Sequence, residues 1–184
     1  MYATNRVLYW AQPARFPLSV REDGRQGEVR GPRMRSLFET VSAFLEEDGW
    51  STSRLPDQTA LLMEFQGEHG RWGCLARVDD RYGQLVFHSL CPVAVPAERR
   101  PAMAEFLTRA NYGMPLGNFE LDLEDGEVRF KTSIDMEDVE PNAVLVKHVI
   151  YANVIMMDRY LPGIVSVAEG AMSPAEAIAE IEEN

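Results

Sequence analysis

The sequence predicts an α+β fold in which an antiparallel β-sheet is flanked by helices, in the order α-β-β-β-α-β-β-α. Three observations indicate this class. Helical periodicity and strand-type alternation occupy separate runs, a hairpin turn at Asp125-Gly126 joins two of the strands, and no βαβ alternation or internal repeat is present. Successive strands joined by short turns pair antiparallel. The apolar faces of the helices are then expected to pack onto the sheet.

Composition limits the function classes before any motif is considered. The chain has 184 residues, of which 46% are hydrophobic and 26% charged, and its net charge is −11. Such a surface repels phosphate, so we expect no direct nucleic-acid binding. Two cysteines are too few for a disulfide scaffold, and the first residues lack the apolar stretch of a signal peptide. A cytoplasmic location is therefore expected.

The charge is unevenly distributed and suggests three segments. Residues 1–36 hold seven arginines against three acidic residues, whereas the remainder holds eleven basic and 26 acidic side chains, a net charge of −15. Residues 1–33 are interpreted as an arginine-rich N-terminal arm, because they are rich in Gly, Pro and Arg and lack periodicity. Residues 34–169 form the predicted domain, and residues 170–184 form an acidic C-terminal tail with a short helix.

The first half of the domain predicts one helix and three strands. An apolar stripe begins at Met34, continues to Leu45 with helical spacing, and ends at Gly49, a residue that suits a helix C-terminus. Alternation then predicts strands over 59–66, 72–79 and 84–93. A second amphipathic helix follows around 103–110.

The hairpin around Asp125-Gly126 is the most strongly specified local structure. A two-residue turn there pairs Leu123 with Val128, Leu121 with Phe130 and Phe119 with Thr132 on one face. On the other face it pairs Asp122 with Arg129 and Glu120 with Lys131. Apolar residues meet apolar residues, and opposite charges meet.

The last long helix, over 144–161, has apolar residues on all sides and must be buried on more than one side. Its five charged or polar interruptions argue against a membrane span. A small domain rarely covers such a helix, so we expect a second protomer or a client to cover part of it, and the protein to be a homodimer. The residues predicted to form this dimer or client surface are Val146, Val149, Ile150, Met156 and Met157. Beyond it, Ser173 and Glu176 form a capping box that opens a short acidic helix.

No residue pattern indicates catalysis. The three histidines, His69, His88 and His148, lie in different elements without a second metal ligand nearby, and Cys74 and Cys91 fit buried core positions. The carboxylates near the hairpin lack the order of a calcium loop, and no glycine-rich phosphate loop or nucleophile elbow occurs. We therefore expect no catalytic, cofactor or metal site, and no enzyme.

The stretch NYGMPLGNFELDLEDGEVRFKTSI resembles the YbjN family of bacterial proteins, and the resemblance extends over about residues 34–161. It implies a fold similar to the small dimeric chaperones of type III secretion, without known cofactors. The motif is structural rather than catalytic, and the arginine-rich first 33 residues and the tail depart from the pattern. Its matching residues are Asn111, Gly117, Phe119, Asp122, Gly126, Val128, Arg129 and Phe130.

The leading hypothesis is a chaperone-like protein-binding module that binds or masks a partner protein. Its acidic surface suits a basic client, of which a DNA-binding protein is one kind. The alternative is a regulatory or signalling protein that binds a small ligand or a partner, and a third reading is an enzyme whose site one sequence does not reveal. A broad apolar groove favours the first hypothesis, and a pocket with converging polar groups favours the others.

Overall fold

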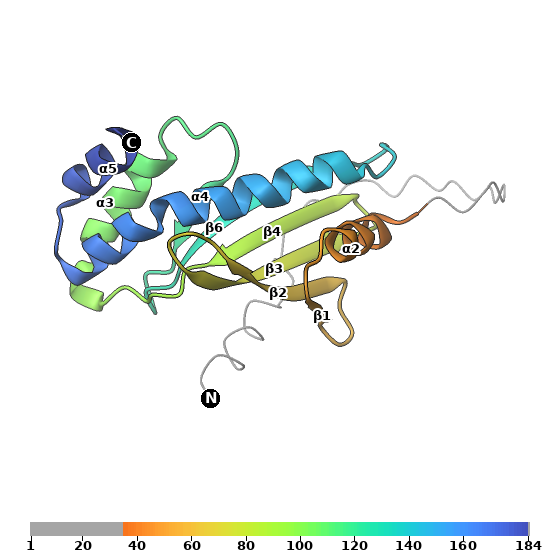
Figure 1. Cartoon of the computed structure of the whole chain (residues 1–184), viewed down its shortest axis with the longest axis horizontal. Coiled ribbons are helices and arrows are strands. Elements are labelled where there is room, and N and C mark those ends of the chain that lie inside the picture. The colour runs from red at the N-terminus through yellow and green to blue at the C-terminus, as the bar shows by residue number, and fades with distance from the viewer. Residues whose placement is uncertain (1–34, 184) are drawn as a thin grey trace. The chain divides into compact units, whose positions relative to one another are not determined.

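The computed structural model describes residues 35–183, so the predicted arm, residues 1–33, lies outside the described residues. Within that part, the chain alternates short runs of strands and helices as the sequence predicts (Figure 1). The strands are β1 (Thr52–Arg54), β2 (Ala60–Gln66), β3 (Arg71–Asp79), β4 (Gln84–Leu90), β5 (Asn118–Leu121) and β6 (Val128–Asp135). The helices are α2 (Leu37–Glu47), the 3-10 turn η1 (Ala97–Arg99), α3 (Arg100–Asn111), α4 (Ala143–Glu169) and α5 (Pro174–Glu183).

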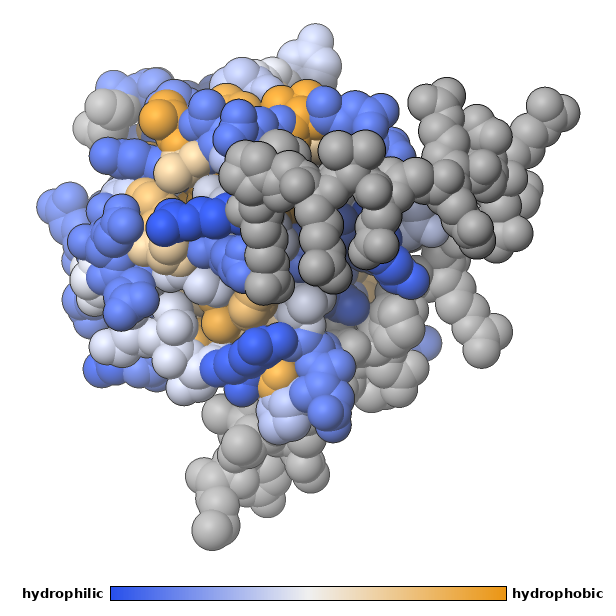
Figure 2. Space-filling view, turned by 90° about the vertical axis from the view of Figure 1, so that its right-hand side faces the viewer, coloured by the Kyte–Doolittle hydropathy of each residue, from blue (hydrophilic) through white to orange (hydrophobic). Residues whose placement is uncertain are grey.

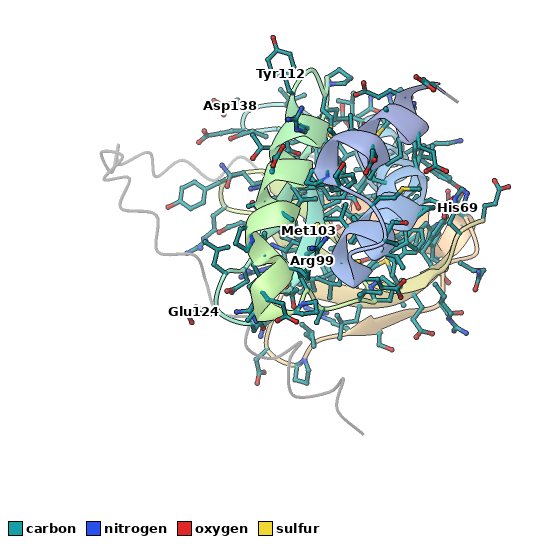
Figure 3. All side chains as sticks on the ribbon, turned by 90° about the vertical axis from the view of Figure 1, so that its left-hand side faces the viewer. His69, Arg99, Met103, Tyr112, Glu124 and Asp138 are labelled. Carbon is teal, nitrogen blue, oxygen red and sulfur yellow. The ribbon has the colours of Figure 1, made fainter. Side chains whose placement is uncertain are left out.

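The six strands form one antiparallel sheet in the order β1-β2-β3-β4-β6-β5. The helices pack on one face of it, and α4 lies over that face (Figures 1 and 3). The α+β class and the predicted strands and helices are thereby confirmed. The structure adds β1, a three-residue edge strand whose residues are all exposed and which is too short to show alternation.

The helix-facing side of the sheet carries the core, because alternate residues of each strand point to the same face. Three rings connect the sheet to α4. The Phe119 ring lies 4.6 Å from Phe130 and 5.4 Å from Tyr160, measured between centroids. Figure 3 shows Met103 of α3 within the helical layer and Tyr112 projecting outward, which agrees with exposed fractions of 0% and 90%.

Helix α2 begins later than the apolar stripe suggests. Ser36 caps it with a capping box: its hydroxyl accepts from the Glu39 N–H at 3.1 Å, and the Glu39 carboxylate accepts from the Ser36 N–H at 3.0 Å. At the other end Gly49 adopts a φ of +82°, as predicted for the helix C-terminus. The chain reverses there and sends Trp50 back toward the helix, where its N–H donates to the Leu45 carbonyl.

Helix α4 is longer than predicted, since it continues through Pro162 to Glu169 and ends at Gly170, whose φ is +78°. A proline inside a helix costs roughly 3 kcal/mol, because it removes one backbone hydrogen bond. The extension buries Ile164 and Val167 completely, and each such burial contributes about 1.5–3 kcal/mol. Packing therefore outweighs the local preference to end the helix.

A buried polar cluster holds α4 against the sheet. Asn153 is completely buried, and its side-chain NH2 lies 3.0 and 3.1 Å from the carbonyl oxygens of Phe87 and Phe130. It also lies 3.1 Å from the Thr132 hydroxyl, which donates to the Val149 carbonyl at 2.9 Å. These bonds join α4 to β4 and β6 at one point, so they determine which helix residues face the sheet.

The hairpin has the predicted faces but a different register. Phe119 pairs with Phe130 and Leu121 with Val128, two residues away from the predicted pairing. The connection is longer than a two-residue turn, because Asp122 pairs with Glu127 and the Gly126 N–H bonds back to the Asp122 carbonyl. Leu123 therefore lies in the turn with 65% of its surface exposed, and the predicted Leu123–Val128 pair was wrong. Gly126 has a φ of +82° and lies so close to the Val95 carbonyl that a Cβ would overlap it, so tertiary contact selects the longer turn.

Replacing Asn153 tests the polar cluster. Asn153→Ala removes three buried side-chain hydrogen bonds and leaves a small cavity between α4 and the sheet, so it should lower the free energy of unfolding by about 2–3 kcal/mol. His148→Ala, on the exposed side of the same helix, should change it by less than about 0.5 kcal/mol. Urea denaturation measures both, and equal losses would contradict the assigned role of Asn153.

The hairpin register is tested by comparing Leu123→Asp with Phe119→Asp. In the observed register the first change adds a charge to an exposed turn and should alter stability by about 0.5 kcal/mol or less. The second places a charge in the core and should cost about 3 kcal/mol or more. If Leu123→Asp lowers the free energy of unfolding by several kcal/mol in chemical denaturation, the two-residue turn with Leu123 on the core face would be correct instead.

Candidate functional site

The residues predicted to form a dimer or client surface lie mainly inside the chain's own core. Val146, Val149, Ile150 and Met157 are at most 3% exposed, and Met156 is partly buried. The sheet covers α4 along one side, and α2, α3 and α5 contact it along its length. Most of the apolar residues around this helix are therefore buried within one chain. Dimerisation remains a prediction, and these residues do not support it.

The face drawn in Figure 2 agrees with this burial, because its hydrophobic areas (orange) are small and surrounded by hydrophilic side chains (blue). Several large apolar side chains of α4 and the turn before it are nevertheless exposed. They are Val139, Val144, Leu145 and Ile155.

The cysteines and the sheet histidine occupy structural positions. Burial raises the pKa of the Cys74 thiol to about 12 and that of Cys91 to about 11, so both stay protonated at neutral pH. Burial and then the nearby Arg129 lower the pKa of His88 to about 4, and it stays neutral. Among residues 35–183 no group of three His, Cys, Asp or Glu side chains could hold a metal ion.

One surface hollow combines aromatic rings with polar groups. It has a volume of about 710 Å³ and lies where the end of α2, strands β1 and β2, and the middle of α4 meet. Such a volume lies within the range of roughly 300–1,000 Å³ that is typical of ligand sites. We call it the edge hollow; it is lined by Asp48, Gly49, Trp50, Ser51, Ser53, Leu62, Met63, Glu64, Phe65, Gln66, Arg71 and Tyr151.

Aromatic stacking holds the inner side of the edge hollow. The Trp50 ring stacks on Phe65 at 5.2 Å between centroids, with 27° between the planes, and Phe65 lies 5.3 Å from Trp72. Trp50 reaches Phe65 because Gly49 reverses the chain after α2. Rings of this kind offer a large rigid surface for binding at a small entropic cost.

The Asp48 carboxylate joins α2 to α4 at the rim. Its Oδ2 accepts hydrogen bonds from the Tyr151 hydroxyl at 2.7 Å and from the Trp50 indole N–H at 2.9 Å. The Tyr151 bond, and after it the Trp50 bond, lower the pKa of Asp48 below its ordinary value, and the Tyr151 bond also raises the pKa of Tyr151. The rim therefore carries a fixed negative charge at neutral pH.

Strand β2 offers backbone groups beside the edge hollow. Strand β1 pairs with Leu61–Met63, so no strand of the described residues pairs with the outer edge of 64–66. The Ala60 carbonyl accepts from Leu55 on that side, so the even-numbered residues of β2 direct their backbone groups outward. Glu64 also forms an ion pair with Arg71 across the β2–β3 pair.

The edge hollow is therefore suited to binding. Its titratable groups with a shifted pKa, Asp48 and Tyr151, are moved away from neutrality, so neither is poised for proton transfer near pH 7. No pattern in the sequence marks Trp50, Asp48 or Tyr151 as site residues. The sequence places Asp48 and Trp50 on either side of Gly49, but this local arrangement alone does not indicate a site. Tyr151 lies about 100 residues further along the chain, so its contact with Asp48 depends on the fold.

No helix in residues 35–183 combines the length and the apolar character that crossing a membrane requires.

These features define an α+β domain with helices on one face of an antiparallel sheet and an aromatic-lined hollow at the sheet edge. The chain belongs to the YbjN family, whose model is described as "Putative bacterial sensory transduction regulator" and matches residues 38–165. A comparison with curated proteins gives no significant match.

A solved structure has the same fold. It is the crystal structure titled "YbjN, a putative transcription regulator from E. coli", with 14% sequence identity and a TM-score of 0.50. The alignment covers 66% of this chain and 88% of the E. coli chain.

The motif that carries the family resemblance has a structural role here. The Asn111 amide accepts from the Phe119 N–H at 2.7 Å and donates to the Phe119 carbonyl at 3.1 Å, so it ties the end of α3 to the start of β5. Gly117, with a φ of +81°, leaves no room for a Cβ beside the Phe130 ring. The motif therefore closes the fold at the sheet edge opposite the edge hollow.

The hydrogen bonds to Asp48 predict a pH-dependent contribution to stability. Because the pKa of Asp48 is lower in the folded than in the unfolded chain, this contribution is present above the unfolded value of about 3.9 and is lost as pH falls through the folded value. Tyr151→Phe removes the larger cause, so the decline in stability between about pH 5 and pH 2 should become shallower. Urea denaturation across that range, with Tyr112→Phe as an exposed control, checks this; an unchanged slope for Tyr151→Phe would contradict it.

Proposed function

We propose that this chain is a regulatory protein-binding module that acts without catalysis and binds a segment of a partner protein at the edge hollow. The family description supports a regulatory role. The observation that carries the proposal is the position of a stacked aromatic pair, Trp50 and Phe65, beside a stretch of the β2 edge with which no strand of residues 35–183 pairs.

This combination suits recognition of an extended polypeptide. A segment laid along a free strand edge forms backbone hydrogen bonds, and its alternate side chains enter neighbouring pockets. Here residues 64–66 supply the edge and the aromatic rings supply the pocket. The Phe65 ring is supported by Trp72, whose ring lies 5.3 Å from it on the neighbouring strand β3.

Strand addition is also what a chaperone-like masking role requires. A partner segment that is extended and unpaired on its own has backbone groups that attract other chains, and pairing them with a sheet edge shields them. The proposal therefore remains a chaperone-like one, but the partner-binding surface is the edge hollow and not the α4 residues that the sequence predicts.

A small-molecule regulator is the second candidate, and the volume of the edge hollow favours it, because about 710 Å³ suffices for an ordinary ligand. The two candidates differ in the use of the strand edge. A small ligand needs only the rings and Asp48, whereas a polypeptide also pairs with residues 64–66.

Site-specific cross-linking tests the proposal. A photo-reactive amino acid at Ser53 or Gln66, which line the hollow, should cross-link a partner protein in the native cell, and the same group at Ala175 on exposed α5 should not. Trp50→Ala combined with the Ser53 probe should abolish the cross-link, because it removes the stacked ring, while thermal denaturation confirms that the fold persists. Cross-links of equal yield at Ser53 and Ala175, or a Ser53 product that survives Trp50→Ala, would overturn the proposed site.

A further inference from the structure

We propose that the partner segment at the edge hollow is basic, and that the Asp48 carboxylate and the Tyr151 ring receive one arginine or lysine side chain of it. This inference rests on the proposed function and specifies the chemistry of the partner.

The Asp48 carboxylate keeps one oxygen for a ligand. Both of its side-chain hydrogen bonds end on Oδ2, from the Tyr151 hydroxyl and the Trp50 indole, which leaves Oδ1 without a donor among the described residues. The two donors also fix the orientation of the group, so a ligand does not have to order it. Because they keep the carboxylate ionised, it is ready to accept from a cationic donor at neutral pH.

The neighbouring ring already carries a cation from the same chain. The Lys147 ammonium lies 5.7 Å from the centroid of the Tyr151 ring, within the usual distance for a cation–π contact. Lys147 lies one turn before Tyr151 on the exposed side of α4. A partner guanidinium approaching Oδ1 would compete with it for this ring, so Lys147 marks the position and the charge of the expected ligand group.

The other charges of the edge hollow favour a basic ligand. Glu64 and Arg71 pair with each other, so Asp48 is the charged lining residue that has no ion-pair partner within 4.0 Å among the described residues. Beyond residue 36 the chain carries 26 acidic against eleven basic side chains, so its field attracts a basic segment from a distance. Local geometry and long-range steering therefore select the same sign of charge.

The backbone edge determines how such a segment would lie. Even-numbered residues of β2 point their backbone groups outward, and the Glu64 and Gln66 positions lie next to the aromatic lining. A strand added there alternates its side chains between the two faces of the sheet. The side chains on the helix-facing side lie beside Phe65, and one of them reaches Asp48 and Tyr151.

Synthetic peptides test the inference on the full-length protein. The probes are fluorescein-labelled ten-residue peptides of alternating Val and Thr with one central arginine, and two matched peptides with glutamine or glutamate in its place. Fluorescence anisotropy should show that the arginine peptide binds about tenfold more tightly than the glutamine peptide and that the glutamate peptide binds most weakly. Asp48→Asn, which preserves the acceptor for Trp50 and Tyr151, should remove this preference.

Two further variants separate a specific site from general attraction. Glu182→Gln removes one carboxylate from exposed α5 and should leave the preference for arginine intact. Lys147→Gln removes the competing cation and should tighten binding of the arginine peptide severalfold. If Asp48→Asn and Glu182→Gln weaken binding equally, the attraction is a property of the whole acidic surface and the inference fails.

The outcomes also distinguish this inference from the proposed function. If the arginine, glutamine and glutamate peptides bind equally and Trp50→Ala abolishes all three, the edge hollow binds polypeptides but has no preference for basic ones. That result would overturn the inference and keep the proposed function. Failure of all three peptides to bind at millimolar concentration would count against both.

Discussion

The packing of α4 across the sheet is the constraint on which the rest of the molecule depends. Asn153 is buried at that interface and bonds to the carbonyl groups of two neighbouring strands, β4 and β6. Burying its NH2 group is costly unless the group reaches these acceptors, so Asn153, together with the buried apolar residues of α4, favours one rotation of the helix. The rotation of α4 in turn decides which of its residues point toward α2, α3 and α5.

The candidate site is a consequence of the same rotation of α4. With Asn153 facing the sheet, Tyr151 two residues earlier faces the end of α2, where it donates to Asp48. The turn at Gly49 returns Trp50 to the same place, and its indole donates to the same carboxylate oxygen. Two helices and a turn thus meet at one group, and the hollow lies between them and the short edge strand β1.

The family motif and the proposed binding site lie at opposite edges of the sheet. The family motif, with Asn111 closing α3 onto β5, lies at the opposite edge of the sheet from β1 and the edge hollow. Residues at one edge hold the fold, while the other edge has backbone groups with which no strand of residues 35–183 pairs, partly exposed aromatic rings and the Asp48 carboxylate. A binding site can therefore change at the β1 edge without loss of the contacts that define the family.

The sequence by itself determined the fold class, most strands and the caps of the helices, because periodicity, turn glycines and capping residues act over a few positions. Tertiary structure decided the rest. The hairpin register depends on how closely Gly126 approaches Val95, and the extension of α4 past Pro162 depends on what buries Ile164 and Val167. The apolar residues Val146 and Ile150 look unpartnered in the sequence, but the sheet covers them. Asp48 and Tyr151 meet across about 100 residues, and no local pattern encodes a contact that only the packing of two helices creates.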